Sequence, residues 1–450
     1  MRSRAGHWML AQVVLAGSVL TGPHYAMAAP ATGPLRVHPD NPRYFTDGSG
    51  KAIYLTGSHI GWELQDHGWG RDLVFDYRAF LDMLEAHNHN FFRLWVVEHT
   101  RWASSTTPWA TPMPYARTGP GQALDGGLKF DLTQFDQAYF DRLRSRVIAA
   151  RDRGIYAAVM LFQGWSIESK DGRTDNPWAA HPFNAGNNVN GIDGDLDGDG
   201  EGKEVHTLHN RAVTALQEAY VRQVVDAVND LGNVLYEIAN ESGPYSTAWQ
   251  YHMINFVKRY EATKPKQHPV GMTAQSRGAT NQALFDSPAD WISPRREGGY
   301  RDDPPAADGS KVIIVDTDHL WGVNGPKTGE WVWKCLCRGL NPIYMDSYTN
   351  QEALTIIENQ QFDPAREPIR RAMGHARAYA DRMNLAAMVP RNDLASSSYC
   401  LANPGREYLV YLPTGGEVTV DLSDAAGTLS VEWSDPRRGT AADRGAVEGG

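Results

Sequence analysis

A short apolar segment that ends in the polar pair Asn240-Glu241 constrains the fold of this chain more than any other feature. Residues 233–239 are mostly apolar, with β-branched and aromatic side chains, which is typical of a buried strand. A polar pair at the end of a buried parallel strand is where a barrel enzyme carries its catalytic groups. The same pair also suits the first turn of a helix, with Asn240 or Ser242 as the cap, so the rest of the sequence has to decide.

Other short apolar segments resemble this one, and segments with helical spacing of apolar residues separate them. The predicted strands are 52–57, 90–97, 155–162, 233–239, 268–273, 290–293, 311–315 and 341–345. The predicted helices are 77–86, 135–153, 208–228, 245–260, 351–359 and 365–383. This alternation predicts an α/β chain with a (β/α)8 TIM barrel. An open doubly wound sheet is the alternative, but no glycine-rich phosphate loop supports it.

The pattern changes at about residue 390, where short segments with alternating apolar residues begin. These segments, 408–412, 418–422 and 429–433, predict a small antiparallel β domain. The sequence ends at Gly450 in turn-like residues, so we expect the domain to be incomplete in the sequence given. We therefore divide the chain into a signal peptide (1–28), a barrel (34–388) and a small β-sandwich domain (390–450).

The first residues are typical of a secretory signal peptide. Arg2 and Arg4 precede an apolar segment from Met9 to Leu20, and Ala26-Met27-Ala28 fits a cleavage site. We expect a mature chain that starts near Ala29 and a secreted or periplasmic protein. No later apolar segment is long enough to span a bilayer. The alternative is a membrane anchor formed by the Met9–Leu20 segment itself.

Composition narrows the class of partner. The formal net charge of -10 argues against nucleic acid or an anionic membrane. The chain has 14 tryptophans and 19 tyrosines, and although aromatic residues are often core, several tryptophans lie in polar segments where they would suit sugar rings. The three cysteines, Cys335, Cys337 and Cys400, have no zinc spacing, and we expect unpaired buried thiols, with a pair to Cys400 as the alternative.

Polar and aromatic residues near the predicted strand ends are the candidates for substrate binding. Arg93 lies inside an apolar strand, and a buried guanidinium is costly without a partner, so we expect a carboxylate beside it. The candidate substrate-binding residues are His59, Trp62, Arg93, Trp95, Glu98, Trp165, Asn240, His319 and Trp321.

Two carboxylates on opposite strands would provide acid–base chemistry. A retaining glycosidase needs a pair about 5 Å apart, one protonated and one ionised near neutral pH. Glu241 follows the fourth predicted strand, and Asp316 and Asp318 follow the seventh, where strand alternation would put both aspartates on one face. Asp318 would lie further out beside His319, whereas Asp316 would lie deeper and could pair with Arg93. The choice stays open, and a polar turn with an Asx cap is the simpler interpretation of both aspartates.

Residues 191–202 form an acidic, glycine-rich segment. Its alternating aspartates resemble the ligand spacing of a calcium loop. With no glutamate assigned to the twelfth position, the match to the EF-hand pattern is treated as partial, and a solvated acidic loop is the alternative. The predicted ligands of a structural calcium are Asp193, Asp195, Asp197 and Asp199. No cofactor is expected for catalysis.

Residues 235–241, Leu-Tyr-Glu-Ile-Ala-Asn-Glu, resemble the fourth-strand motif of the clan A glycoside hydrolases. Residues 57–62, 92–95 and 315–322 make the chain most similar to the apiosidase-like barrel family within that clan. The segment 399–436 is similar to a C-terminal domain named as the collagen-binding domain of a collagenase. The resemblance covers about residues 34–440.

The resemblance implies hydrolysis of a glycosidic bond in a plant or microbial polysaccharide or oligosaccharide. It implies Glu241 as the acid/base and a seventh-strand carboxylate as the nucleophile, although the clan usually has Glu where this chain has Asp. One rival hypothesis is a non-catalytic carbohydrate- or matrix-binding protein on a barrel scaffold. Another is a metal-dependent hydrolase that uses Asp316, Asp318, His319 and His59.

Overall fold

The computed structural model describes residues 9–15, 29–61, 63–66, 74–101, 110–169, 176–276, 278–346 and 361–450. Its centre is an eight-stranded sheet in which hydrogen-bonded neighbours run parallel, in the order β4-β13-β12-β11-β10-β9-β8-β5. The strands are β4 (Gly57–His59), β5 (Phe91–Leu94), β8 (Tyr156–Gln163), β9 (Val234–Asn240), β10 (Val270–Thr273), β11 (Trp291–Ser293), β12 (Val312–Asp316) and β13 (Asn341–Met345). The predicted fold class is confirmed.

The sheet curls until its first and last strands adjoin. The Asn90 amide, just before β5, donates to the Thr56 carbonyl, just before β4, at 3.0 Å, and the Thr56 amide donates to the Asn90 side chain at 3.0 Å. A Cβ on Gly57 would lie 2.1 Å from the Phe91 carbonyl oxygen, so only glycine permits this approach of β4 to β5. A backbone bond, a side-chain bond and close packing therefore complete the barrel.

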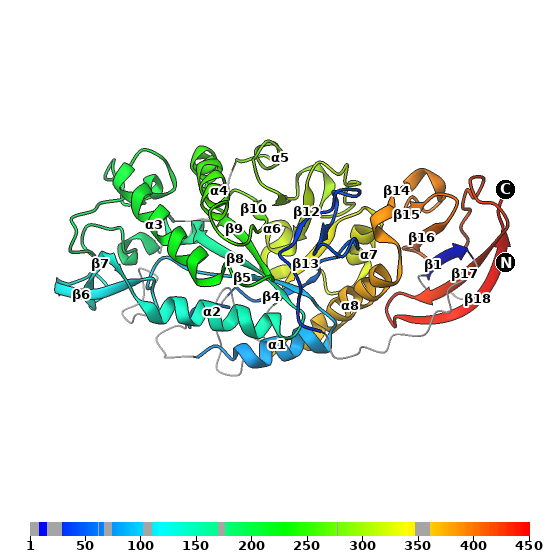
Figure 1. Cartoon of the computed structure of the whole chain (residues 1–450), viewed down its shortest axis with the longest axis horizontal. Helices are drawn as coiled ribbons and strands as arrows, with labels where there is room; N and C mark the ends of the chain where they lie inside the picture. Colours follow the sequence, from blue (N-terminus) through cyan, green and yellow to red (C-terminus); the bar gives the residue numbers. More distant parts are fainter. Residues whose placement is uncertain are drawn as a thin grey trace.

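Helices cover the outside of the barrel and alternate with its strands (Figure 1). They are α1 (Tyr77–Ala86), α2 (Gln137–Arg151), α3 (Arg211–Val228), α4 (Thr247–Glu261), α5 (Gln282–Phe285), α6 (Thr317–Trp321), α7 (Glu330–Cys337) and α8 (Glu367–Arg382). Asp76, Asp136 and Asn210 cap the first turns of α1, α2 and α3 through their side chains, which explains where these helices begin. The predicted helix at 351–359 lies outside the described residues.

Two layers of side chains fill the barrel because alternate residues of each strand point inward. The lower layer belongs to an apolar cluster that includes Phe91, Leu235, Trp291, Val312, Ile314 and Ile343. Two residues further along four of these strands, the inward positions become polar: Arg93, Glu237, Ser293 and Asp316. An apolar floor therefore supports a polar layer near the carboxyl ends of the strands.

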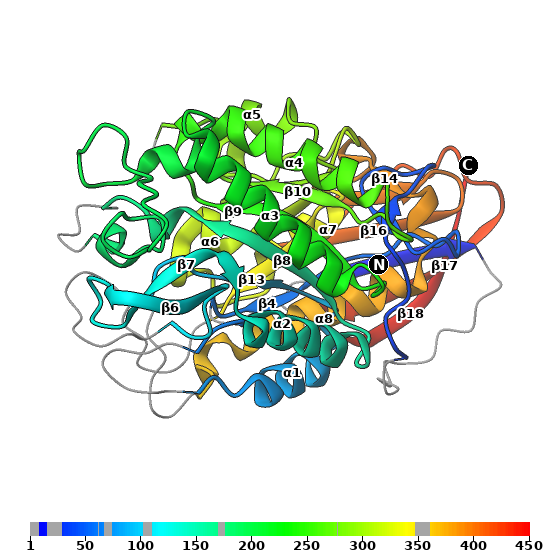
Figure 2. The ribbon, with the colours of Figure 1, turned by 60° about the vertical axis from the view of Figure 1, so that its left-hand side comes forward.

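An insertion extends the barrel on the side away from the β domain (Figure 2). It contains the antiparallel hairpin β6 (Tyr115–Gln122) and β7 (Leu128–Phe135), which the sequence did not predict. Its own apolar cluster includes Met113, Phe130, Trp178 and Val205. A two-stranded antiparallel ribbon of β2 (Arg36–Val37) and β3 (Phe45–Thr46) precedes the barrel.

The C-terminal residues form an antiparallel sheet in the order β14-β15-β16-β1-β17-β18. Its strands are β14 (Val389–Pro390), β15 (Cys400–Asn403), β16 (Glu407–Leu412), β17 (Thr428–Asp435), β18 (Thr440–Glu448) and β1 (Met9–Leu15). The prediction of a strand at 418–422 is wrong: Val420 makes only an isolated bridge with Ala395, while Val418, Val420 and Leu422 pack on the domain's apolar cluster. The N-terminal strand β1 instead lies between β16 and β17.

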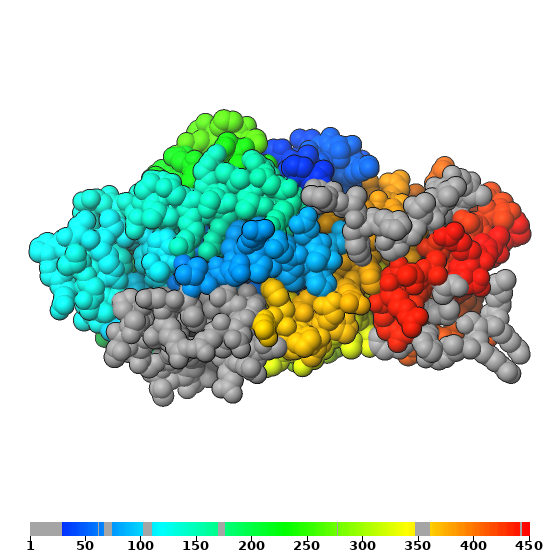
Figure 3. Space-filling model, turned by 90° about the horizontal axis from the view of Figure 1, so that it is seen from below, coloured from blue at the N-terminus to red at the C-terminus, as the bar shows by residue number. Residues whose placement is uncertain are grey.

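The β domain packs against α7 and α8 of the barrel. In the view from below, α8 and β18 lie side by side (Figure 3), and a Cβ on Gly439 would meet the His375 ring at 2.5 Å. Trp333 of α7 stacks on Tyr411 of β16 with ring centroids 6.4 Å apart. The three cysteines are buried free thiols, as predicted.

Candidate active site

Arg93 is the centre of the polar layer inside the barrel. Its guanidinium is fully buried and bonds to both Glu237 oxygens, with Nε 2.8 Å from Oε2 and Nη2 2.5 Å from Oε1. Nη1 donates to Asp316 at 2.8 Å and to Asp318 at 3.3 Å, and Nη2 donates to the Asn240 side-chain oxygen at 2.6 Å. Arg93 therefore has three carboxylate partners, where the sequence predicted one, and they lie on two sides of the barrel.

Asp316 ends β12 and is completely buried. His59 Nε2 lies 2.9 Å from one Asp316 oxygen and 3.0 Å from the other. Burial alone would raise the pKa of Asp316, but the charges of His59 and Arg93 outweigh it and hold that pKa well below its usual range. Asp316 is thus an ionised internal partner of Arg93 and His59, with no exposed surface to offer a substrate.

Asp318 lies in a different position from the one that strand alternation predicts. It belongs to α6, where Asp316 caps the helix by accepting a bond from the Asp318 amide at 2.9 Å. Its side chain keeps 9% exposure, whereas Asp316 has none. Burial and the charges of Glu241 and Asp316 raise the pKa of Asp318 to about 8. The turn of α6 therefore separates a buried ionised aspartate from a more accessible one that retains its proton.

Glu241 follows the last residue of β9 and is partly exposed. Its backbone has φ 46°, a left-handed conformation that is uncommon for residues other than glycine. The indole N–H of Trp165 donates to a Glu241 carboxylate oxygen. This bond helps to fix the direction of the Glu241 carboxylate.

Asn240 and His319 are buried and bind other protein groups. The Asn240 amide donates to the Gln163 side chain at 3.1 Å, and its oxygen accepts from Arg93. His319 Nε2 lies 3.2 Å from that oxygen and Nδ1 2.8 Å from Ser293 Oγ. Burial lowers the pKa of His319 to about 3, so the ring is neutral. Both residues support the layer that holds Arg93.

The remaining candidates for substrate binding fall into different environments. Trp95 stacks on His59, with centroids 5.6 Å apart, and lies under the Arg93 guanidinium at 5.1 Å. Glu98 accepts from the Gln163 amide at 2.8 Å and lies 3.1 Å from His206 Nε2. Trp321 packs edge-on against Trp331, and Trp62 lies outside the described residues.

Sequence reasoning missed Glu237, which bonds bidentately to Arg93. The signal was present, because a glutamate in the apolar segment 234–240 needs a partner as much as an arginine in 91–94 does. Ser242 and His206 were also missed, and nothing in their sequence context separates them from ordinary turn residues.

The oxygen and nitrogen atoms of Asp316, Asp318 and His319 lie within 4.8 Å of one another, a spacing compatible with a metal ion. Arg93 already donates to both aspartates at this point. A divalent cation would have to lie beside a buried guanidinium, and like charges at that distance repel strongly. The residues present therefore fit a metal poorly.

The acidic loop brings together Asp195, Asp197 and Glu204, whose ligand atoms lie within 4.8 Å of one another. Counted from Asp193, Gly198 is sixth and Glu204 is twelfth, so the calcium-loop spacing is complete and the interpretation as a partial match was wrong. Asp193 and Asp199 are not part of this group. Lys203 pairs with Asp199 at 3.1 Å and also with Glu201.

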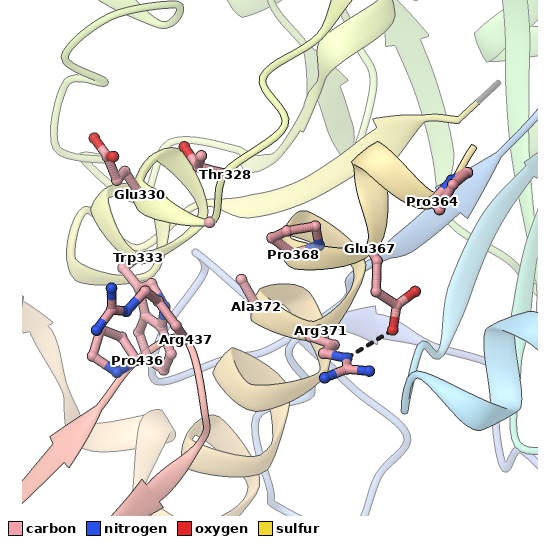
Figure 4. Close-up of a pocket in the computed structure, with 11 residues that line it drawn as sticks. Thr328, Glu330, Trp333, Pro364, Glu367, Pro368, Arg371, Ala372, Pro436 and Arg437 are labelled. Atoms are coloured by element: carbon pink, nitrogen blue, oxygen red, sulfur yellow. Dashed lines mark hydrogen bonds and ion pairs between the residues drawn. The ribbon is translucent and has the colours of Figure 1, made fainter. Parts of the chain in front are cut away.

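A separate hollow of about 670 Å³ lies between α7, α8 and the turn that joins β17 to β18 (Figure 4). Trp333, Ala372 and three prolines contribute apolar lining, and its carboxylates are Glu330 and Glu367. Glu367 is paired with Arg371 at 2.7 Å and with His87 at 3.0 Å. Among the predicted site residues that the structure describes, none lines this hollow.

Two family models match parts of the sequence. One is described as a domain of unknown function (DUF6298) and matches residues 97–280, which include the end of β9. The other is described as a "Putative collagen-binding domain of a collagenase" and matches residues 386–449. No curated protein matches the chain.

Solved structures share the fold. A glycoside hydrolase family 5 protein from Bacteroides vulgatus ATCC 8482 has a TM-score of 0.59 and 12% identity, and the match covers 94% of this chain and 92% of that one. A structure named "Glycoside hydrolase" has a TM-score of 0.61 and 13% identity over 94% of both chains. The barrel with its C-terminal β domain is thus an architecture that other proteins share along nearly their full length.

Proposed function

We propose that this chain hydrolyses a glycosidic bond with Glu241 and Asp318 as its two carboxyl groups. The observation that carries the proposal is the position of both groups just beyond the carboxyl ends of β9 and β12, where each keeps some exposure. There the charge of Glu241 also raises the pKa of Asp318. Asp316 is excluded from direct chemistry in this proposal because His59 and Arg93 occupy it and it is fully buried. This choice separates the two aspartates that the sequence left open.

One proton shared by two carboxyl groups near neutral pH is what glycoside hydrolysis requires. In the proposal the proton belongs to the pair, because the titrations of interacting groups are coupled. Glu241 is the acid/base, as the residue after Asn240, and Asp318 is the nucleophile of a retaining mechanism. Asp318 must then pass its proton to Glu241 as the sugar binds, and the Arg93 N–H at 3.3 Å stabilises the resulting Asp318 carboxylate.

The substrate class in the proposal is a plant or microbial polysaccharide or an oligosaccharide derived from one. Support comes from two structurally similar proteins that are named as glycoside hydrolases, one of them of family 5. Trp165, which is half-buried and bonded to Glu241, supplies aromatic surface beside the carboxyl pair, which suits pyranose or furanose rings. The apiosidase-like specificity of the resembling family is part of this proposal.

We also propose that residues 1–28 are a secretory leader and that the mature protein is secreted or periplasmic. In the described part of the chain, no helix has the length and apolar character needed to cross a bilayer. Cleavage after Ala28 would remove β1 from the β domain. Intact-mass measurement of the exported protein should give a chain that starts near Ala29; an uncleaved chain would contradict the leader.

Replacing either carboxyl group should abolish turnover. We expect Glu241→Gln to lower kcat roughly 10²–10⁴-fold, because a positioned proton-transfer group contributes about that much. Asp318→Asn should lower kcat at least as much, because it removes the nucleophile that forms the covalent intermediate. Hydrolysis of aryl glycosides and of pectic and other polysaccharides is measured for both variants. Exogenous azide then assigns the roles, since it traps glycosyl azides of opposite anomeric configuration in acid/base and nucleophile variants. Full activity of Glu241→Gln would remove Glu241 from the mechanism. Sugar binding without turnover in the parent protein, unchanged in Glu241→Gln, would favour a carbohydrate-binding protein without catalysis.

The two aspartates should affect stability with opposite sign. The pKa of Asp318 is raised to about 8, so the folded chain holds a proton there that the unfolded chain loses above pH ~4. Asp318→Asn should therefore gain in Tm relative to the parent protein as pH rises from about 4 to 8. Asp316→Asn should lower Tm at neutral pH, and its deficit should shrink as pH falls below ~4, because the pKa of Asp316 is depressed. Parallel pH profiles of the two variants would contradict this assignment.

We further propose that the acidic loop binds a structural calcium ion through Asp195, Asp197 and Glu204. A loop with this spacing and these oxygen donors matches the preference of calcium for carboxylate ligands. Calcium at 100 times its Kd should stabilise the protein by ~2.7 kcal/mol, measured as a rise in Tm that chelation reverses. Glu204→Gln should remove this rise, whereas Glu201→Gln, whose carboxylate pairs with Lys203, should keep it. An equal response of both variants would leave only non-specific binding.

A further inference from the structure

The backbone at Glu241 is strained and must be held by its surroundings. A glutamate at φ 46° lies in the left-handed region, which is unfavourable for a residue with a Cβ. Such a conformation persists only where neighbouring groups fix it. The groups around Glu241 therefore decide where its carboxylate points.

One constraint is the close approach of Gly164 to Glu241. A Cβ on Gly164 would lie 2.5 Å from the carbonyl carbon and oxygen of Glu241 and from the Ser242 amide nitrogen. Gly164 begins a short 3-10 turn, η1 (Gly164–Ser166), which also carries Trp165 with its bond to the Glu241 carboxylate. This turn confines both the backbone and the side chain of Glu241 from one side.

A buried chain of polar groups holds the next residue. Ser242 Oγ lies 2.9 Å from His206 Nδ1, and His206 Nε2 lies 3.1 Å from Glu98 Oε2. Ser242 and His206 have no exposed surface. The same Glu98 oxygen accepts from the Gln163 amide at 2.8 Å, which ties the chain to the residue before Gly164. Ser242 also accepts through its carbonyl from the Ser276 amide at 3.0 Å.

The His206 ring is fixed independently of these bonds. It stacks on Trp249 with ring centroids 4.5 Å apart and an interplanar angle of 17°, and Phe162 contacts it edge-on. Burial opposes charge on Glu98, but the charges and bonds of His206 and His181 outweigh it and lower the pKa of Glu98 to about 2. Because the His206 ring is fixed, it holds the Glu98 carboxylate and the Ser242 hydroxyl at a fixed separation.

We propose that the buried chain Glu98–His206–Ser242 holds the strained backbone of Glu241, with His206 as a positioning residue for catalysis. Glu98, which the sequence suggested as a substrate ligand, acts here within the protein interior. The inference rests on the proposed role of Glu241. His206 would affect catalysis through the position of Glu241, because a displacement of about 1 Å at a catalytic group lowers turnover roughly 100-fold.

The test uses His206→Phe and Ser242→Ala in the full chain. Phenylalanine keeps the stack on Trp249 and removes both polar contacts, and alanine removes only the contact next to Glu241. We expect kcat to fall roughly 10- to 100-fold in both variants, with KM changed less than about threefold, because binding groups stay in place. If His206→Phe does not fold, Ser242→Ala decides the question with the same readout.

The matched control is His268→Phe. His268 is also buried between a glutamate and a polar backbone group, with Nδ1 2.7 Å from Glu261 and Nε2 2.8 Å from the Leu231 carbonyl, but it lies before β10 at the opposite end of the barrel. The His268→Phe variant should be less stable than the parent protein, but its kcat should equal the parent value at a temperature where the variant is folded. Parent-level kcat in His206→Phe and Ser242→Ala, or an equal fall in His268→Phe, would overturn the inference. If Glu241→Gln itself stayed active, the proposed function would fail instead.

Discussion

A buried guanidinium inside the barrel determines most of the arrangement around it. Arg93 has no exposed surface, so its charge must be balanced by protein groups rather than by water. Glu237, on β9 two residues beyond the apolar floor, accepts hydrogen bonds from two Arg93 N–H groups. Asp316, at the same level on β12, accepts one more. The polar layer therefore ties strands on opposite sides of the barrel through one side chain.

The charge balance of this layer explains why one aspartate keeps its proton. Arg93 and His59, whose pKa Asp316 raises against the effect of burial, provide positive charge for Glu237 and Asp316. Asp318 receives one longer bond from Arg93 and also experiences the negative charges of Glu241 and Asp316. A carboxyl group in that position is easier to protonate than to ionise. Its altered acidity is a property of the whole layer, so it could not be derived from residues 316–318 alone.

The sequence predicted the barrel well because strand and helix periodicity are local signals. The strands at 311–315 and 341–345 were placed within a residue or two, since each is an apolar segment bounded by polar residues. Local signals gave wrong predictions where long-range contacts determine the secondary structure. Strand alternation was extended past residue 315 to Asp318, but Asp316 caps a helix there. The segment 418–422 alternates like a strand yet packs without joining the sheet. The contacts that support Glu241 could not be predicted, because Glu98, His206 and Ser242 meet only in the folded chain.

The two candidate carboxyl groups are controlled by different physical effects. Asp318 is adjusted from within the barrel, where burial and crowded charges change its affinity for a proton. Glu241 is adjusted from the strand end, where a left-handed backbone, a close glycine and an indole N–H restrict its direction. The contacts that fix the two groups meet at Asn240 and Gln163, and the charge of Glu241 couples the groups directly by raising the pKa of Asp318. Asn240 is the structural link between them, because its side chain bonds to Arg93 on one side and to the Gln163 amide oxygen on the other while its backbone leads directly into Glu241.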